Sequence, residues 1–252
     1  MKLIINSDDF GYSQGHNYGI IRSFTHGVLK STTLMANGKE VKHAIDLIKE
    51  NPSLDVGIHV VLDHGLPLSP THLIPSLVNK HHQFKKLTLE EVYSLNLEEV
   101  EIEINTQIQS LLNQGVDLTH MDSHHHIHMH PHLFATFVGL AKKYKLVLRL
   151  VQGEAVSFEE LLKKEGVKYV HCNARFYKET VSLDFFQPYE FSEEVEELMT
   201  HPAYCDEIIL RESSYAMHRV LELDVLCHES LPILLQNQNI ELISFKNIKE
   251  KV

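Results

Sequence analysis

Short apolar runs alternate along the chain with longer segments in which apolar residues recur every three or four positions. The short runs predict buried strands, because apolar segments of about four to eight residues between turn residues are typical of parallel sheets. We expect strands at Leu3–Ile5, Val56–Val61, Leu118–Met121, Leu146–Leu150, Tyr169–Cys172 and Leu242–Phe245.

The longer segments predict amphipathic helices between these strands. The best-marked apolar faces consist of Val41, Ala44, Ile45 and Ile48, and of Leu97, Val100, Ile104, Ile108 and Leu111. Ser157 followed by Glu160 forms a capping box, which predicts a helix start, and Ser192 with the acidic residues after it predicts another. Gly115 and Gly166 each follow a helical run and precede a strand, as C-terminal caps do.

Repeated alternation of strand and helix is typical of parallel strands covered by helices, arranged as a barrel or as a doubly wound sheet. Residues 63–88 interrupt this alternation, since they are rich in Pro, His and Gly, and we expect a long loop there, over the active site. No internal repeat, low-complexity segment or linker divides the sequence. We therefore expect one domain that spans residues 1–252.

Composition narrows the functional classes. The formal net charge is −11 and no basic run offsets it, which argues against a nucleic-acid or anionic-membrane binder. The apolar stretch at the N-terminus is too short for a signal peptide, and no stretch reaches transmembrane length. Cys172, Cys205 and Cys227 form no C-x-x-C pair, so we expect neither a disulfide framework nor a thiolate zinc site. These features predict a cytoplasmic protein.

Asp8 and Asp9 directly follow the first predicted strand. The carboxyl ends of parallel strands are where α/β proteins bind ligands, so one carboxylate there can ligate a cation while the other acts as a base. An Asx-turn that caps the next helix is the alternative, because Gly11 and Ser13 suit a turn.

Histidines are concentrated in one segment, with seven of them at positions 120–132. Imidazole suits Zn²⁺, Ni²⁺ and Fe²⁺, and carboxylates add affinity for Mg²⁺ and Mn²⁺. In an extended segment alternate side chains share a face, so His124, His126 and His128 would point one way and His125 the other. We expect one or two metal ligands here, although a surface histidine tract has the same composition.

Three further residues are candidates for the same site. His59 lies in an apolar run, where a histidine is either a ligand or a satisfied core residue. Arg149 lies in an apolar strand, and it needs an anionic partner such as an active-site carboxylate unless it reaches solvent at the strand end. His201 precedes Pro202 and is either a general acid or a loop histidine. Asp or His at several strand ends together indicates a metal-dependent hydrolase.

At these residues the sequence resembles the YdjC-like carbohydrate deacetylase family, nearly from end to end. The motifs that carry the resemblance are Asn6-Ser7-Asp8-Asp9-Phe10-Gly11, Asn17-Tyr18-Gly19-Ile20-Ile21, Ser31-Thr32-Thr33, Asn37-Gly38, Gly57-Ile58-His59 with Gly65 and Pro67, the block from Thr119 to Met129, His201-Pro202-Ala203, Ser214-Tyr215, and Arg219 with Glu222-Leu223-Asp224-Val225-Leu226. The acidic start combined with the histidine block is the specific signal. Ser7 and His130 depart from the family, which usually has alanine and an apolar residue at these positions.

The resemblance implies a distorted (β/α) barrel that binds one divalent cation, usually Mg²⁺, with Zn²⁺ as the alternative. The metal ligands map to Asp9, His59 and His124 of this chain, and the general base maps to Asp8. More distant polysaccharide deacetylases use an arginine that orients the base and a late histidine acid. By that looser analogy, Arg149 and His201 take these roles.

The implied activity is removal of acetyl groups from N-acetylglucosamine units of short chitooligosaccharides, free or phosphorylated, by a chain that forms a homodimer. One rival keeps the metal and changes the substrate, as in a phosphoesterase or amidohydrolase on a similar barrel. A second rival is a metal-storage protein that uses the histidine tract. A metal-storage protein would bind several cations per chain and would not need Asp8 or His59 to bind them.

Overall fold

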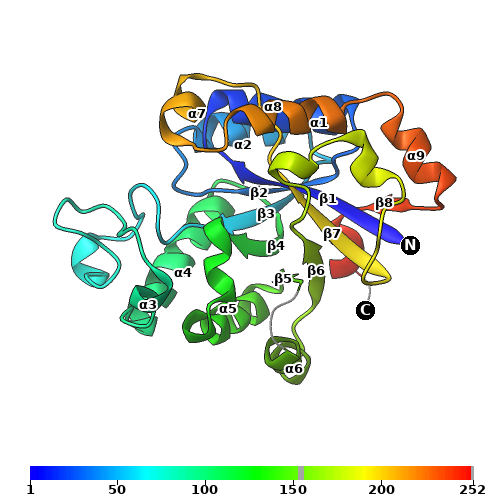
Figure 1. Ribbon diagram of the computed structural model, residues 1–252. Coiled ribbons are helices and arrows are strands. Elements are labelled where there is room, and N and C mark those ends of the chain that lie inside the picture. Colours follow the sequence, from blue (N-terminus) through cyan, green and yellow to red (C-terminus); the bar gives the residue numbers. More distant parts are fainter. Residues whose placement is uncertain (153–155, 251–252) are drawn as a thin grey trace.

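The computed structural model describes residues 1–152 and 156–250 of the chain. The strands in this part of the chain run parallel to one another in one eight-stranded sheet (Figure 1). They are β1 (Lys2–Phe10), β2 (Ser31–Leu34), β3 (Asp55–Val60), β4 (Leu118–Ser123), β5 (Val147–Val151), β6 (Tyr169–Asn173), β7 (Val195–Thr200) and β8 (Glu241–Ile243). Every residue of β1 after Lys2 is buried, including the apolar residues at its start.

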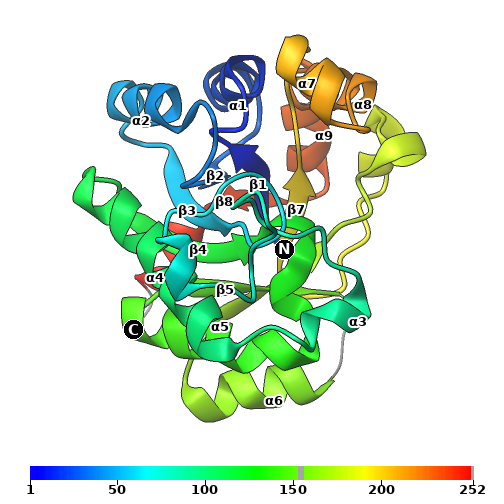
Figure 2. The ribbon, with the colours of Figure 1, turned by 90° about the vertical axis from the view of Figure 1, so that its left-hand side faces the viewer.

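The sheet closes into a distorted barrel. Its strand order is β2-β3-β4-β5-β6-β7-β1-β8, and an additional pairing between β2 and β1 joins the two sides of a seven-stranded ring. The pairing partner of β1 changes along its length, because β8 pairs with residues 2–4 while β2 pairs with Asn6, Ser7 and Phe10. Figure 2 shows the strands at the centre of the molecule with helices outside them. The prediction of a distorted (β/α) barrel is confirmed.

Helices cover the barrel on opposite sides in both views (Figures 1 and 2). On one side lie α1 (Gln14–His26), α2 (Val41–Glu50), α7 (Glu207–Glu212) and α8 (Met217–Leu226), and on the other α3 (Leu89–Val92), α4 (Leu97–Asn113), α5 (Pro131–Tyr144) and α6 (Val156–Glu165). The chain ends with α9 (Leu231–Asn237) and α10 (Phe245–Lys249). Within the described ranges, no helix is long and apolar enough to cross a membrane.

Local sequence signals account for most helix boundaries. The Ser13 side chain accepts a hydrogen bond from the His16 amide and caps α1, and Pro131 begins α5. Gly115 and Gly166 have φ values of +81° and +68°, which confirms that each ends its helix in the left-handed region.

Three sequence-based assignments are wrong, and one strand was missed. The segment after Ser192 forms β7 rather than a helix, and β2 was not predicted at all. Phe245 does not belong to the last strand but begins α10. Ser157 lies inside α6 rather than at its cap, since the helix already includes Val156. In β2 and β7, polar side chains occupy fully buried positions, which hides a strand from a hydrophobic pattern.

The predicted long loop is confirmed, since residues 61–88 contain only a short 3-10 turn, Thr71–Leu73, and one isolated bridge. Its first part is fixed to α4 by two buried side chains. Glu103 accepts hydrogen bonds from the amides of Leu68 (3.0 Å) and Ser69 (2.9 Å), and Gln107 bonds both backbone groups of Val61. These bonds hold the start of the loop beside the strand ends.

Gly57 in β3 leaves room for a buried histidine. A methyl group at this position would lie 2.6 Å from the His120 ring, which stacks on Phe245 at a centroid distance of 3.8 Å. His120 also bonds Asn6 across the barrel, at 3.1 Å between Nε2 and Oδ1. The ring is therefore clamped between two elements and has little freedom to move.

We predict that Gly57→Ala lowers the free energy of unfolding by about 1–3 kcal/mol, because the methyl group overpacks the barrel interior against His120. Chemical denaturation measures the change. Gly139→Ala is the matched control, because a methyl group there meets nothing within 4 Å in α5, and it should stabilise by about 0.5–1 kcal/mol. Equal stabilities of the two variants would contradict the packing argument.

Candidate active site

The residues proposed from sequence meet in one pocket at the carboxyl ends of the strands. The pocket has a volume of about 990 Å³. Those of the proposed residues that line it are Asp8 and Asp9 at the end of β1, His59 of β3, His124 after β4, and His201 after β7. Arg149 of β5 lies behind Asp8 and is 1% exposed. The parallel strands thus bring together side chains that lie far apart in sequence.

Asp9 is at the centre of the candidate metal centre. It has a φ of +62°, a left-handed conformation that is uncommon for a residue other than glycine. Its Oδ1 lies 3.2 Å from His59 Nε2 and 3.1 Å from His124 Nδ1. Burial raises the pKa of Asp9, but the charge of Arg219 and the two imidazoles outweigh burial and hold the pKa well below its usual range. Asp9 is therefore ionised.

The second nitrogen of His59 fixes how its ring is presented. Nδ1 donates to Asp122 Oδ1 at 2.7 Å, so Nε2 is the nitrogen that points toward Asp9. Burial lowers the pKa of His59, but Asp122 and the other nearby carboxylates outweigh it and hold the pKa well above its usual range. A cation bound at Nε2 would replace the proton there. Thr33 of β2 donates to Asp122 Oδ2 at 2.9 Å and holds that carboxylate in place. His59 Nε2 is buried and has no hydrogen-bond partner.

A cation fits this donor set. The ligand atoms of Asp9, His59 and His124 all lie within 4.8 Å of one another, and an orphaned buried nitrogen is a cost that a bound cation would remove. One carboxylate and two imidazoles on three elements leave further coordination positions toward the pocket, as in catalytic sites. The same atoms therefore form a candidate site for one divalent cation.

Asp8 forms a bidentate ion pair with Arg149, with distances of 2.6 and 2.7 Å. Asn6 donates a further hydrogen bond to Asp8 Oδ1 at 3.1 Å. Burial raises the pKa of Asp8, but the charge and hydrogen bonds of Arg149 outweigh it and hold the pKa far below its usual range. A carboxylate has about four lone-pair positions, so three hydrogen bonds leave one for a water or substrate atom in the pocket.

Arg149 binds two further buried carboxylates. Its Nε lies 3.0 Å from both oxygens of Glu197 on β7, and one terminal nitrogen lies 2.8 Å from Asp122 on β4. Burial raises the pKa of Asp122 and raises that of Glu197 to about 7, against the lowering effect of Arg149. The guanidinium thus compensates a cluster whose carboxylates are not all fully ionised near neutral pH, and the expected anionic partner of Arg149 is present.

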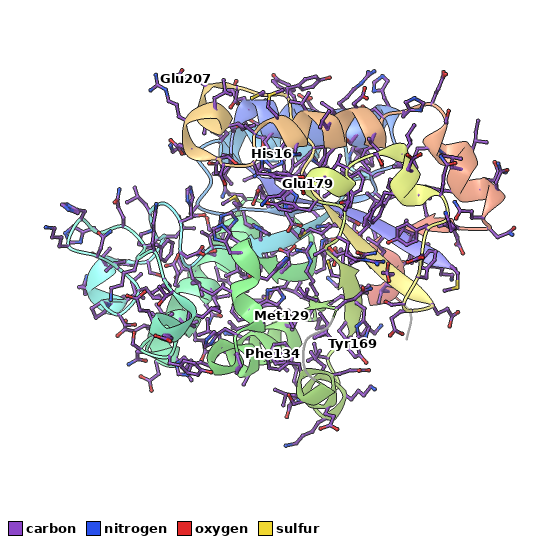
Figure 3. The ribbon with its side chains drawn as sticks, viewed as in Figure 1. His16, Met129, Phe134, Tyr169, Glu179 and Glu207 are labelled. Carbon is purple, nitrogen blue, oxygen red and sulfur yellow. The ribbon has the colours of Figure 1, made fainter. Side chains whose placement is uncertain are left out.

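Arg219 of α8 holds the other side of Asp9. One terminal nitrogen lies 2.9 Å from Asp9 Oδ2, and its Nε donates to the Tyr215 carbonyl at 2.9 Å. His16 of α1, labelled in the interior in Figure 3, lies 3.4 Å from the same guanidinium. Burial and Arg219 keep the pKa of His16 well below its usual range, so this ring is neutral.

His201 lines the same pocket as the first residues of the histidine tract. Its backbone amide donates a short hydrogen bond to Glu222, and its Nδ1 lies 3.6 Å from Glu222 Oε1. Nδ1 is buried and has no hydrogen-bond partner. Asp8 is close enough for the charge of His201 to affect it. Base and acid candidates therefore face one pocket.

The histidine tract is not extended, and the alternation expected for it is wrong. Within His124–Met129, helical turns meet at a kink, where His125 and His126 have φ values of +52° and +53°. His124 meets Asp9, His125 bonds Asp63 at 2.7 Å, and His126 lines the pocket. The left-handed residues turn consecutive rings into the pocket rather than to opposite faces.

The remaining tract histidines make structural hydrogen bonds. His128 Nε2 donates to the Arg149 carbonyl at 3.2 Å. His130 caps α5 through Nδ1 and donates to the Leu89 carbonyl, and His132 donates to the Leu95 carbonyl, both at 2.9 Å. The bonds of His130 and His132 attach the start of α5 to α3 and to the residues directly after it.

Sequence reasoning assigned no role to five side chains of this site: Thr33, Asp122, Glu197, Arg219 and Glu222. Asp122 carried a usable signal, because it ends a strand directly before the histidine triplet. Glu197 lies in the acidic run that favoured a helix, and Arg219 and Glu222 lie in an ordinary helical pattern. The roles of these three side chains become visible only in the folded structure, which shows the site residues that each one contacts.

Comparison with known proteins gives consistent matches over nearly the whole chain. A family model described as YdjC-like protein matches residues 2–237. A carbohydrate deacetylase of Brevibacillus brevis is 38% identical over 255 residues, which cover 98% of this chain and all of the relative. A chitooligosaccharide deacetylase of Serratia marcescens is also 38% identical and covers 98% of both chains.

A solved structure supports the same relationship. A protein of Enterococcus faecalis V583, whose proposed role is cellobiose-phosphate cleavage, has a TM-score of 0.90 and 30% identity over 98% of both chains.

The bond between Asp122 and His59 yields a test of the metal centre. Asp122→Asn removes the anion that orients His59, so affinity for a divalent cation should fall about 10- to 100-fold, measured by calorimetric titration of the folded protein. Asp55→Asn, at the far end of β3, is the control and should bind the cation normally, since its carboxylate bonds Thr119 and the Lys246 amide instead. Unchanged affinity in Asp122→Asn would show that the bond from Asp122 does not prepare His59 to bind the cation.

Proposed function

This chain belongs to the YdjC-like protein family, and from that membership and its site we propose that it is a metal-dependent hydrolase acting on acetylated sugars. The reaction is removal of N-acetyl groups from N-acetylglucosamine units of short chitooligosaccharides, with release of acetate. The relatives named carbohydrate and chitooligosaccharide deacetylase support this choice of substrate. The chain is accordingly a carbohydrate deacetylase, a hydrolase of amide bonds.

One observation carries the proposal. Asp9, the unpartnered Nε2 of His59, and His124 converge beside the buried Asp8–Arg149 pair, and all but Arg149 face the same open pocket. A metal-storage protein has no use for an oriented, ionised carboxylate next to its ligands. The pocket, at about 990 Å³, is large enough for a disaccharide unit.

Asp9, His59 and His124 are the residues that would hold the cation. When bound, a divalent cation polarises the acetyl carbonyl and makes water a stronger nucleophile. Mg²⁺ is the cation that the resemblance implies, and two imidazoles also suit Zn²⁺. Arg219 keeps Asp9 charged and oriented whichever cation is used.

Asp8 is the proposed general base. Arg149 fixes both of its oxygens and so limits the carboxylate to one orientation toward the pocket. The carboxylate takes the proton of the attacking water through its remaining lone pair. His201, which lines the same pocket, gives a proton to the departing amine, so that the sugar leaves as a neutral glucosamine unit.

Phosphorylated chitooligosaccharides are included in the proposal. Lys86 and Arg211 line the pocket, and they offer cationic partners for a phosphate on the sugar in a chain whose net charge is −11. The Enterococcus faecalis neighbour, which is associated with a phosphorylated disaccharide, supports the same extension.

Acetate release tests the proposed function. The protein should release acetate from N,N′-diacetylchitobiose or its phosphorylated form, lose this activity with a chelator and regain it with added Mg²⁺ or Zn²⁺. A generic phosphate ester assayed in parallel should release no phosphate. Phosphate release without acetate release would replace the deacetylase with a phosphoesterase.

Asp8→Asn should bind the cation normally and lower kcat by about 10²- to 10⁴-fold, because the amide cannot take the proton of water. Acetate release and metal content of the same preparation measure the two effects. Glu212→Gln is a matched control on the pocket wall, where the carboxylate pairs with Lys39, and it should keep the wild-type kcat. Normal turnover by Asp8→Asn would show that another group is the base.

A further inference from the structure

Glu222 is a fully buried carboxylate of α8 that the mechanism above does not use. Its Oε2 accepts the backbone amide of His201. Its Oε1 accepts the Tyr215 hydroxyl at 2.6 Å and lies 3.6 Å from His201 Nδ1. Both oxygens are therefore directed to His201 and to the residue that packs beside it.

Tyr215 and Tyr177 cover this carboxylate on the pocket side. Their rings stack at a centroid distance of 4.2 Å with 11° between the planes, and both line the pocket. The His201 ring meets both of them, at 5.7 Å from Tyr215 and 6.1 Å from Tyr177. Stacked rings exclude water from the Glu222–His201 pair, which strengthens the attraction between a carboxylate and an imidazolium.

We propose that Glu222 is the positioning residue for the general acid, and that Tyr215 fixes Glu222 in that position. The orphaned Nδ1 of His201 is the atom that Glu222 serves, because a small rotation of either side chain closes the 3.6 Å gap into a charge-assisted hydrogen bond. This proposal rests on the proposed deacetylase function.

The geometry gives the two nitrogens of His201 different roles. Nδ1 carries its proton toward Glu222, and Nε2 carries the proton that is transferred. When the tetrahedral adduct collapses, the carbon–nitrogen bond breaks, its electron pair remains on nitrogen, and that nitrogen takes the Nε2 proton. The oxyanion becomes the carbonyl group of acetic acid, so neutral His201, the free amine and acetic acid result, and the acetic acid ionises to acetate in water.

One helix connects this acid with the metal centre. Arg219 and Glu222 are three residues apart in α8, so they lie on the same face of the helix. Arg219 holds Asp9 and Glu222 holds His201, while the backbone and the hydroxyl of Tyr215 each bond one of the two. The spacing between Asp9 and His201 is thus set by a single turn of α8.

The leaving group provides the test. Amide cleavage needs a proton on the departing nitrogen, whereas the phenolate of 4-nitrophenyl acetate departs without one. Glu222→Gln should lower kcat for N,N′-diacetylchitobiose about 10²-fold with little change in KM, and leave metal-dependent cleavage of the aryl acetate nearly intact. Tyr215→Phe, which removes only the hydroxyl, should show the same pattern with a loss of about tenfold.

Two controls separate this role from a structural one. Glu196→Gln removes a buried carboxylate from β7 that bonds Tyr189 and Ser192 outside the pocket, and it should change neither reaction. Thermal melts identify a misfolded variant, and Tyr215→Phe then carries the test in place of Glu222→Gln.

Equal losses on amide and ester, or wild-type amide turnover in both variants, would overturn the role of Glu222 while leaving the deacetylase function in place. If the wild-type protein releases no acetate from acetylated disaccharides, the proposed function fails and this proposal falls with it.

Discussion

The site depends on one guanidinium. Arg149 of β5 binds Asp8 of β1, Asp122 of β4 and Glu197 of β7, so a single buried cation ties together strands from around the barrel. Without Arg149, three buried carboxylates would lie together with no cation to compensate them, and removing one partner of such a cluster costs about 3–5 kcal/mol. Arg149 thus allows the barrel to bury Asp8, Asp122 and Glu197 close to one another.

The ion pairs of Arg149 also position the candidate metal ligands and the candidate base. Through Asp122, Arg149 is connected to the orientation of His59, and through Asp8 it is connected to the adjacent Asp9. Arg219 approaches Asp9 from α8 on the other side. The candidate ligands and the candidate base are therefore held by two arginines from opposite directions, which gives a preorganised site that needs little rearrangement to bind a cation.

The sequence could predict the parts of this arrangement that leave a local signature. Apolar runs that precede Asp8 or contain His59 or Arg149 predict the strands that carry these polar residues, and the parallel barrel brings them together. The hydrophobic pattern did not predict two strands, β2 and β7, for a physical reason. In β2 Thr33 is buried against Asp122, and in β7 Glu197 is buried against Arg149, so neither strand shows an apolar pattern. The prediction of an extended histidine tract was wrong for another reason, because residue type does not indicate a left-handed backbone at consecutive histidines.

The central claim is that one cation is held by Asp9, His59 and His124, and that the rest of the histidine tract is not its ligand. Anomalous diffraction from crystals grown with Mn²⁺ locates the ion directly. The account predicts a single strong peak at coordination distance from Asp9 Oδ1, His59 Nε2 and His124 Nδ1. A peak held by His125 and Asp63 without Asp9 or His59, or several peaks along positions 120–132, would contradict it.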